Sequence, residues 1–184
     1  MKTLIYPVTA ILALITSLTL AGCSSKPVDE LKMARIAMEQ AQEVEAEEYA
    51  PQEWDRAQMQ WEEANGLVQM GRYGEAREVL TLAVGSFNTA RDNAKRRVES
   101  LKIEITALQS STYKGKKDLE QAAESPKTKP AVKKKIEGAL PLITEKITVM
   151  NTANDAKQYL RARTAGEEAS RWIQGLQKDL TASS

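Results

Sequence analysis

Apolar residues recur at every third or fourth position between residues 73 and 124, which is the spacing of one face of an α-helix. The stripe keeps its register across the polar stretch 110–112, so we predict one helix from Tyr73 to Glu124, weakened near Gly115. A helix of about 50 residues is about 75 Å long and needs packing partners along its length. The stripe consists of Ala76, Leu80, Ala83, Phe87, Ala90, Ala94, Val98, Leu101, Ile105, Leu108, Thr112, Gly115, Leu119 and Ala122.

Two shorter helices are predicted before this one. The first spans about Val28–Tyr49, because Pro27 is placed to open it, and its far end is acidic. The second spans about Gln52–Met70, since Pro51 interrupts the first and Gly71 ends the second. The apolar stripe of the second helix is Trp54, Ala57, Trp61, Ala64 and Val68. Most stripes of this kind belong to the core, and a binding face formed by the two tryptophans is the alternative.

The stretch 125–130 is the clearest turn, with two prolines among serine, threonine and lysine. Helical spacing then continues over a return arm, 131–180, in which Pro141 is expected to kink or split the helix and Gly166 is a second weak point. The arm is about as long as the helix before the turn, so antiparallel pairing of the two is the simplest packing. The predicted fold is therefore all-α, with elongated helical hairpins or an antiparallel coiled-coil-like bundle of four to five helices.

The beginning of the chain has a different pattern. Lys2 precedes an uncharged apolar run, Leu4–Leu20, which ends in Leu20-Ala21-Gly22-Cys23. A run of about 17 residues before small residues is typical of a cleaved secretory signal, and an uncleaved membrane anchor is the alternative. The four residues resemble a bacterial lipobox. That resemblance implies that the signal peptide, residues 1–22, is removed and that Cys23, the only cysteine, carries the lipid.

Lipidation would hold the remaining chain close to a membrane. Residues 23–27 form a tether of little more than about 10 Å before the first predicted helix. Each buried CH₂ of an acyl chain such as palmitate contributes about 0.8 kcal/mol, so two or three chains make a stable anchor. Ser24 follows the cysteine, and its resemblance to Gram-negative sorting signals implies the outer membrane, with the chain facing the periplasm.

The predicted turn near residue 71 has a distinctive spacing, Gly71-x-Tyr73-x-x-Ala76, with Ala83 seven residues later. This resembles the second half of a tetratricopeptide repeat. The resemblance implies that the glycine permits the turn, that the tyrosine packs across the hairpin and that the alanines let the helices approach. The packing residues on the first helix of such a hairpin would be Ala57, Trp61 and Ala64.

The wider stretch from Tyr49 to Ala94 also resembles an uncharacterised bacterial family of alanine-rich periplasmic lipoproteins, classed as a domain of unknown function. The resemblance implies a hairpin at about 50–94 within a helical domain, 28–124. One such repeat is visible in the sequence, whereas a solenoid groove needs about three.

Charge is distributed unevenly along the chain. Residues 24–66 hold 4 basic and 11 acidic side chains, and residues 67–184 hold 21 and 14. The simpler explanation of these opposite net charges, −7 and +7, is an acidic arm lying against a basic arm. Two faces for two different partners are the alternative. Nucleic acid is an improbable partner for an exported chain of near-zero net charge.

The chain has no histidine, which removes the usual general base and the commonest metal ligand. No catalytic residue, metal site or cofactor is therefore predicted. Glu43 and Glu47 lie one turn apart and would meet a Ca²⁺ ion, but a solvated face explains them better. The basic cluster Lys127–Lys135 either contacts an acidic ligand or solubilises a helix end.

These patterns predict a non-enzymatic scaffold or adaptor, anchored by lipid in the cell envelope, that presents a helical hairpin to a protein partner. The alternative is a structural coiled-coil spacer that self-associates or contacts the cell wall. An enzyme is the least favoured function, because the side chains of common catalytic arrangements are missing.

Overall fold

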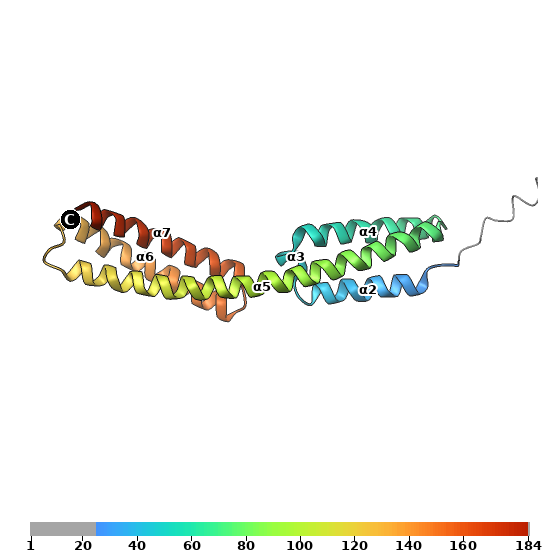
Figure 1. Cartoon of the computed structure of the whole chain (residues 1–184), viewed down its shortest axis with the longest axis horizontal. Coiled ribbons are helices and arrows are strands. Elements are labelled where there is room, and N and C mark those ends of the chain that lie inside the picture. The colour runs from blue at the N-terminus through green and yellow to red at the C-terminus, as the bar shows by residue number, and fades with distance from the viewer. Residues whose placement is uncertain (1–24, 184) are drawn as a thin grey trace, which may run out of the picture. The chain divides into compact units, whose positions relative to one another are not determined.

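The computed structural model describes residues 25–183, and over that range the chain is all-α, which confirms the predicted fold class. The signal peptide and the lipobox, Cys23 included, lie outside the described residues. The described part holds six helices rather than four to five. They are α2 (Val28–Gln42), α3 (Ala46–Tyr49), α4 (Pro51–Gln69), α5 (Tyr73–Glu124), α6 (Pro130–Asp155) and α7 (Tyr159–Ser183) (Figure 1).

The chain forms two compact units that divide inside α5, unit 1 ending at Arg91 and unit 2 beginning at Asp92. Unit 1 contains α2, α3, α4 and the first part of α5, while unit 2 contains the rest of α5 with α6 and α7 (Figure 1). The helix that the long stripe predicted, Tyr73–Glu124, is continuous and therefore belongs to both units. The boundary between units lies within a helix and not at the turn 125–130.

Alanine dominates the core of unit 1. Ala34 of α2, Ala64 of α4 and Leu80 of α5 are fully buried against one another, so three helices meet at close range. Two aromatic side chains add to this core, where the rings of Trp54 and Phe87 meet edge to face at 5.5 Å between centroids. Small residues allow a close helix approach, and the aromatic pair supplies the buried area that alanine lacks.

Polar contacts fix α2 along α5. The Arg77 guanidinium donates to the Glu30 carboxylate and, at 3.3 Å, to the Ser25 carbonyl oxygen. About three turns further along, the Arg91 guanidinium donates to the Gln40 amide oxygen at 2.9 Å. Because both residue numbers rise together, α2 and α5 run in the same direction, with α4 antiparallel to both.

The prediction of a single first helix over Val28–Tyr49 is wrong. It is interrupted at residues 43–45, where Glu45 adopts a left-handed conformation with φ 54°. Glutamates one turn apart repel each other in this acidic stretch, which weakens a continuous helix. After the break, α3 buries Ala46 and Tyr49.

In unit 2, as in unit 1, successive long helical segments run in alternating directions. The core of unit 2 contains larger aliphatic residues. The helix α6 supplies Ile136, Ile143, Ile147 and Met150, all nearly or fully buried. The helix α7 approaches closely because it carries small residues. A Cβ atom at Gly166 would lie 2.7 Å from the Met150 sulfur.

The return arm is not one helix, and its break is not at Pro141. Pro141 lies inside the continuous helix α6, because buried isoleucines on both sides of it offset the lost backbone hydrogen bond, a cost of about 3 kcal/mol. The arm turns instead at residues 156–158, so α6 and α7 form a hairpin beside α5. Gly115 and Gly166, expected weak points, are buried contact positions inside α5 and α7.

Candidate functional site

The turn between α4 and α5 is a helix C-cap of the Schellman type. Gly71 has φ 73°, its N–H donates to the Val68 carbonyl at 3.1 Å, and the Arg72 N–H donates to the Leu67 carbonyl at 2.9 Å. The left-handed conformation favours glycine, which accounts for the residue at this position. Tyr73 then begins α5 as a half-buried side chain.

The turn between α6 and α7 repeats this geometry. Lys157 has φ 60°, its N–H donates to the Asn154 carbonyl at 3.0 Å, and the Gln158 N–H donates to the Ala153 carbonyl at 2.8 Å. Tyr159 begins α7 as Tyr73 begins α5. The two hairpins therefore correspond at an offset of 86 residues, the separation of Gly71 and Lys157.

The second hairpin was not predicted from the sequence, because its turn has a lysine where the first has a glycine. The signal was the spacing Tyr159-x-x-Ala162 with Ala169 seven residues later, the same as in the first hairpin. Ala162 and Ala169 are fully buried, as are the alanines at 76 and 83. Lysine at the left-handed position hides the motif, since only its backbone conformation reveals the correspondence.

The residues named from sequence for the first hairpin are packing residues. Ala64, Ala76 and Ala83 are fully buried, and Trp61 is partly buried against the core that Ala64 and Leu80 share. Of the two tryptophans in the stripe, Trp54 is buried with 6% of its surface exposed. The stripe is therefore core at both tryptophans.

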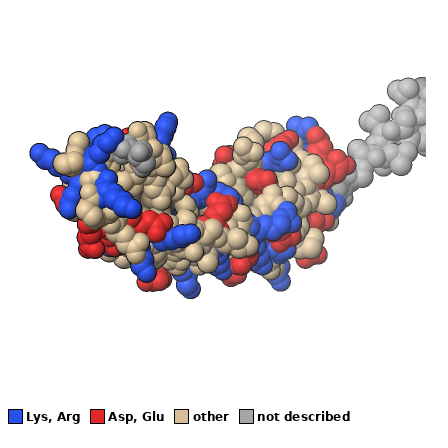
Figure 2. Space-filling model, turned by 60° about the vertical axis from the view of Figure 1, so that its left-hand side comes forward, with Lys and Arg blue, Asp and Glu red and all other residues tan. Residues whose placement is uncertain are grey.

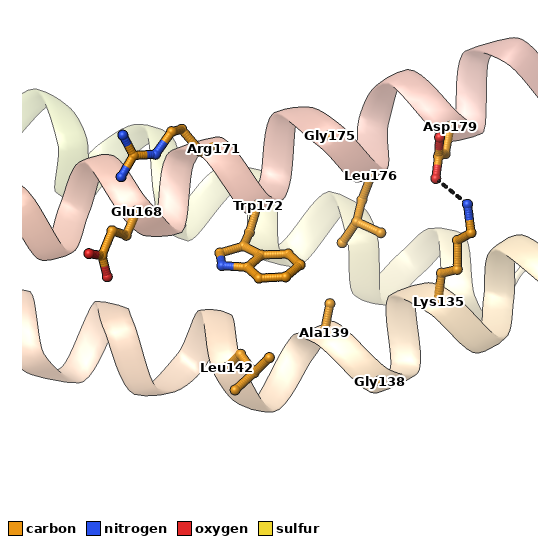
Figure 3. A pocket seen from close by; sticks show the side chains of 10 residues that line it. All are labelled: Lys135, Gly138, Ala139, Leu142, Glu168, Arg171, Trp172, Gly175, Leu176 and Asp179. Carbon is orange, nitrogen blue, oxygen red and sulfur yellow. Dashed lines mark hydrogen bonds and ion pairs between the residues drawn. The ribbon is translucent and has the colours of Figure 1, made fainter.

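A groove of about 900 Å³ lies between α6 and α7 in unit 2 (Figure 3). Trp172 extends from α7 toward α6, and 49% of its surface is exposed. Leu142 of α6 lies opposite it and is 45% exposed. The remaining lining residues are Lys135, Gly138, Ala139, Glu168, Arg171, Gly175, Leu176 and Asp179.

Charged residues stand at both ends of the groove. At one end, Lys135 Nζ lies 2.8 Å from Asp179 Oδ2. At the other end, Glu168 is bound by Lys146, whose Nζ is 2.8 Å from Glu168 Oε2. The hydrogen bond from Lys146 lowers the pKa of Glu168, the charge of Arg171 lowers it further, and the Glu168 carboxylate raises the pKa of Lys146. Both carboxylates are therefore neutralised by lysines.

Arg171 is the cation of the groove without a salt bridge. Its guanidinium makes no side-chain hydrogen bond or salt bridge within the described range 25–183, although its charge lowers the pKa of Glu168. Its side chain is exposed on the α7 side of the groove (Figure 3). A guanidinium beside an exposed indole offers five hydrogen-bond donors next to an apolar surface.

Two glycines widen the groove. A Cβ atom added at Gly138 or at Gly175 would meet no atom within 4 Å, so neither glycine is required by packing. Gly115 and Gly166 are different, because Cβ atoms there would lie 2.5 Å from Ile173 and 2.7 Å from Met150. Glycine inside a helix costs about 1 kcal/mol relative to alanine, so the open glycines lower stability without a structural need.

The first hairpin carries a groove at the corresponding position. It is smaller, about 320 Å³, and is lined mostly by polar side chains. Ser86 occupies the position that corresponds to Trp172, and Arg56 the position that corresponds to Leu142. Six of its lining residues correspond to lining residues of the larger groove: Glu53, Arg56, Leu82, Gly85, Ser86 and Thr89 with Ala139, Leu142, Glu168, Arg171, Trp172 and Gly175.

The basic cluster Lys127–Lys135 spans the turn between α5 and α6 and the first turns of α6. Figure 2 shows lysine and arginine side chains gathered at that end of unit 2. Only Lys135 of the cluster reaches the groove, where it pairs with Asp179. The other lysines remain a solvated patch.

Glu43 and Glu47 do not share a helix face, because the break at residues 43–45 separates them. Among the described residues, no group of three or more acidic or cysteine side chains is arranged to hold a metal ion. Within the same range, none of the helices combines the length and the apolar character needed to cross a membrane.

The family model "Domain of unknown function (DUF4398)" matches residues 29–104 of the chain. The match begins in the first turn of α2, extends through the rest of unit 1 and continues into the part of α5 that belongs to unit 2. It ends before α6 and α7, so the groove with Trp172 lies outside the matched region. No curated protein and no solved structure matches the chain.

Proposed function

We propose that this chain is a non-enzymatic, lipid-anchored adaptor of the bacterial cell envelope that binds a protein partner through unit 2. The observation that carries the proposal is the groove in which Trp172 and Leu142, two large apolar side chains, stand half exposed between α6 and α7. Exposed tryptophan in a concave apolar surface is a common anchor of protein interfaces.

The anchor in this proposal is the lipid on Cys23. The residues Leu20-Ala21-Gly22 before it support a processed lipoprotein, and Ser24 after the cysteine supports an outer-membrane destination. Metabolic labelling with a palmitate analogue tests this point. The chain should incorporate the label and Cys23→Ser should not, whereas equal labelling of both would refute lipidation at this cysteine.

The adaptor function is tested by site-specific photo-crosslinking of the full chain in cells. A benzophenone amino acid at Trp172 should give an adduct with another protein, and the same group at Ser86, its counterpart in the first hairpin, should not. If no exposed position gives an adduct, the adaptor function is wrong. The positions to be scanned are Met33, Met59, Leu82, Ile103, Leu142 and Trp172, all large apolar residues that are exposed.

A structural spacer is the second candidate, and the continuity of α5 over 52 residues and both units favours it. A spacer that acts by self-association would be dimeric in solution. Sedimentation velocity of the fragment 24–184 distinguishes the two functions, because an extended dimer supports the spacer and a monomer supports the adaptor.

A further inference from the structure

We infer that the groove between α6 and α7 binds an acidic amphipathic helix of the partner protein, with a carboxylate of that helix on Arg171. The inference rests on the proposed adaptor function and adds to it the site and the chemistry of the partner. Four properties of the groove support it: its length, its apolar wall, its open glycines and its unpaired cation.

The groove has the dimensions of a helix-binding site. Its lining residues extend from 135 to 142 on α6 and from 168 to 179 on α7. At 1.5 Å per residue these segments are about 10 and 16 Å long, which accommodates two to three turns of a bound helix. Unit 2 has three helices, so a helix laid between α6 and α7 would complete a four-helix packing.

The wall and the glycines match an apolar helix face. Trp172, Leu142 and Leu176 line the groove together with Ala139 (Figure 3). Gly138 and Gly175 present no Cβ to a ligand, and a backbone can approach closely at such positions. Helices that pack at 8–10 Å between axes use small residues in this way. A bound helix would therefore explain the two glycines, which packing within the chain does not require.

The charge of the groove selects an acidic ligand. Glu168 and Asp179 are already paired with lysines, and Arg171 has no salt-bridge partner in the described residues. A ligand carboxylate would therefore gain a guanidinium partner without breaking an existing salt bridge. Unit 2 as described, residues 92–183, holds 18 basic and 12 acidic side chains, so its net charge of +6 favours the approach of an acidic segment.

The corresponding groove of the first hairpin lacks the pair formed by Trp172 and Leu142 in the larger groove. There Ser86 replaces the tryptophan and Arg56 replaces Leu142, and unit 1 as described, residues 25–91, holds 7 basic and 13 acidic side chains. Leu82 is the one large apolar side chain that lines this groove, and the net charge of the described part of unit 1 is −6 rather than +6. The first hairpin therefore provides a matched control within the same chain.

The test uses the full chain reconstituted in nanodiscs of neutral phosphatidylcholine. The probes are two labelled, stapled amphipathic peptides of about 15 residues, one with glutamates and one with lysines flanking the same leucine face. Fluorescence anisotropy should show binding of the glutamate peptide about tenfold tighter than binding of the lysine peptide. Equal binding of both peptides would overturn the inference.

Three variants locate the site. Trp172→Ala should weaken the glutamate peptide about tenfold or more, and Arg171→Glu should reverse the preference between the two peptides. Ser86→Ala, the matched control, should change neither affinity. Unchanged binding in Trp172→Ala or an unchanged preference in Arg171→Glu, with helical content intact by circular dichroism, would overturn the inference.

Crosslinking separates failure of this inference from failure of the adaptor function. Adducts from position 172 should map to an acidic, helix-forming segment of the partner. If partner adducts form only at positions outside the groove, the adaptor function stands and the groove is not its site. If the adduct at position 172 maps to a second copy of this chain, the inference of a different partner protein is wrong.

Discussion

The two helical hairpins of this chain share a turn geometry but place large and small residues on opposite sides. In the first hairpin, Ala64 of α4 faces Leu80 of α5. At the corresponding positions of the second, Met150 of α6 faces Gly166 of α7. The large residue has moved from the second helix to the first, and the total volume is smaller only by the methyl group that separates alanine from glycine. Cores accept such exchanges when volume and pattern are conserved.

The outer surfaces of the hairpins differ more than their cores. The first presents polar residues such as Ser86 in a small groove, and the second presents Trp172 and Leu142 in a groove about three times larger, 900 against 320 Å³. Backbone geometry is therefore common to both, while the side chains of the outer face decide which hairpin is a candidate for binding. Substitutions in the two hairpins can test whether stability and binding depend on different residues.

The largest effect is expected at Leu80. Leu80→Ala removes a fully buried side chain and should lower the free energy of unfolding by about 2–5 kcal/mol. Leu82→Ala is the control, because Leu82 is 58% exposed and its loss should cost less than about 0.5 kcal/mol. Denaturant titration measures both, and hydrogen exchange should place the loss in unit 1. Equal effects of the two variants would contradict the core.

Leucine at position 166, where the corresponding residue of the first hairpin is Leu80, should also lower the free energy of unfolding. Gly166→Leu forces a side chain against Met150 and Leu108 and should cost about 1–3 kcal/mol. Adding Met150→Ala recreates the pair Ala64–Leu80, and part of the loss should be recovered in thermal melts. A double variant no more stable than Gly166→Leu alone would refute the correspondence of the hairpins.

Substitutions at the two left-handed turn residues should change the free energy of unfolding in opposite directions. Gly71→Ala places a side chain at φ 73° and should cost about 1–2 kcal/mol, whereas Lys157→Gly relieves a left-handed lysine and should gain about 0.5–1 kcal/mol. Thermal unfolding measures both changes. A loss of stability in Lys157→Gly would show that the lysine side chain matters more than its backbone conformation.

The open glycines of the groove should separate stability from binding. Gly175→Ala adds a methyl group in free space and should raise the free energy of unfolding by about 0.5–1 kcal/mol. The same methyl group narrows the groove, so binding of the glutamate peptide should weaken. Gly85→Ala in the first hairpin is the control, since it should raise stability and leave binding unchanged.

The smallest effect is the pH dependence of the pair formed by Lys146 and Glu168. The pKa of Glu168 is lowered from 4.5 by the hydrogen bond from Lys146, so the carboxylate stabilises the fold above that value and loses its contribution as pH falls through the lowered pKa. The pKa of Lys146 is raised from 10.5, so its contribution is present below 10.5 and is lost as pH rises through the raised pKa. The difference in melting temperature between the chain and Lys146→Met should be small at neutral pH and should vanish in acid. A difference that persists in acid would contradict this assignment.

The sequence by itself determined the helical fold class, the long helix Tyr73–Glu124 and the core identity of its stripe. These features are local: spacing of apolar residues, proline at helix starts and glycine at one turn are readable without knowing which helices meet. The turn at Gly71 was predicted for the same reason, since a left-handed residue after a helix favours glycine.

Only the tertiary structure decided where the chain divides and where the groove lies. The break at Lys157 has no glycine to indicate it, and the spacing that begins at Tyr159 is recognised as a hairpin only once the left-handed conformation of Lys157 is known. Pro141 does not split α6, because buried neighbours outweigh a lost hydrogen bond. The exposure of Trp172 beside Arg171 depends on how α6 and α7 are rotated about their axes, which the helical spacing of the return arm does not specify.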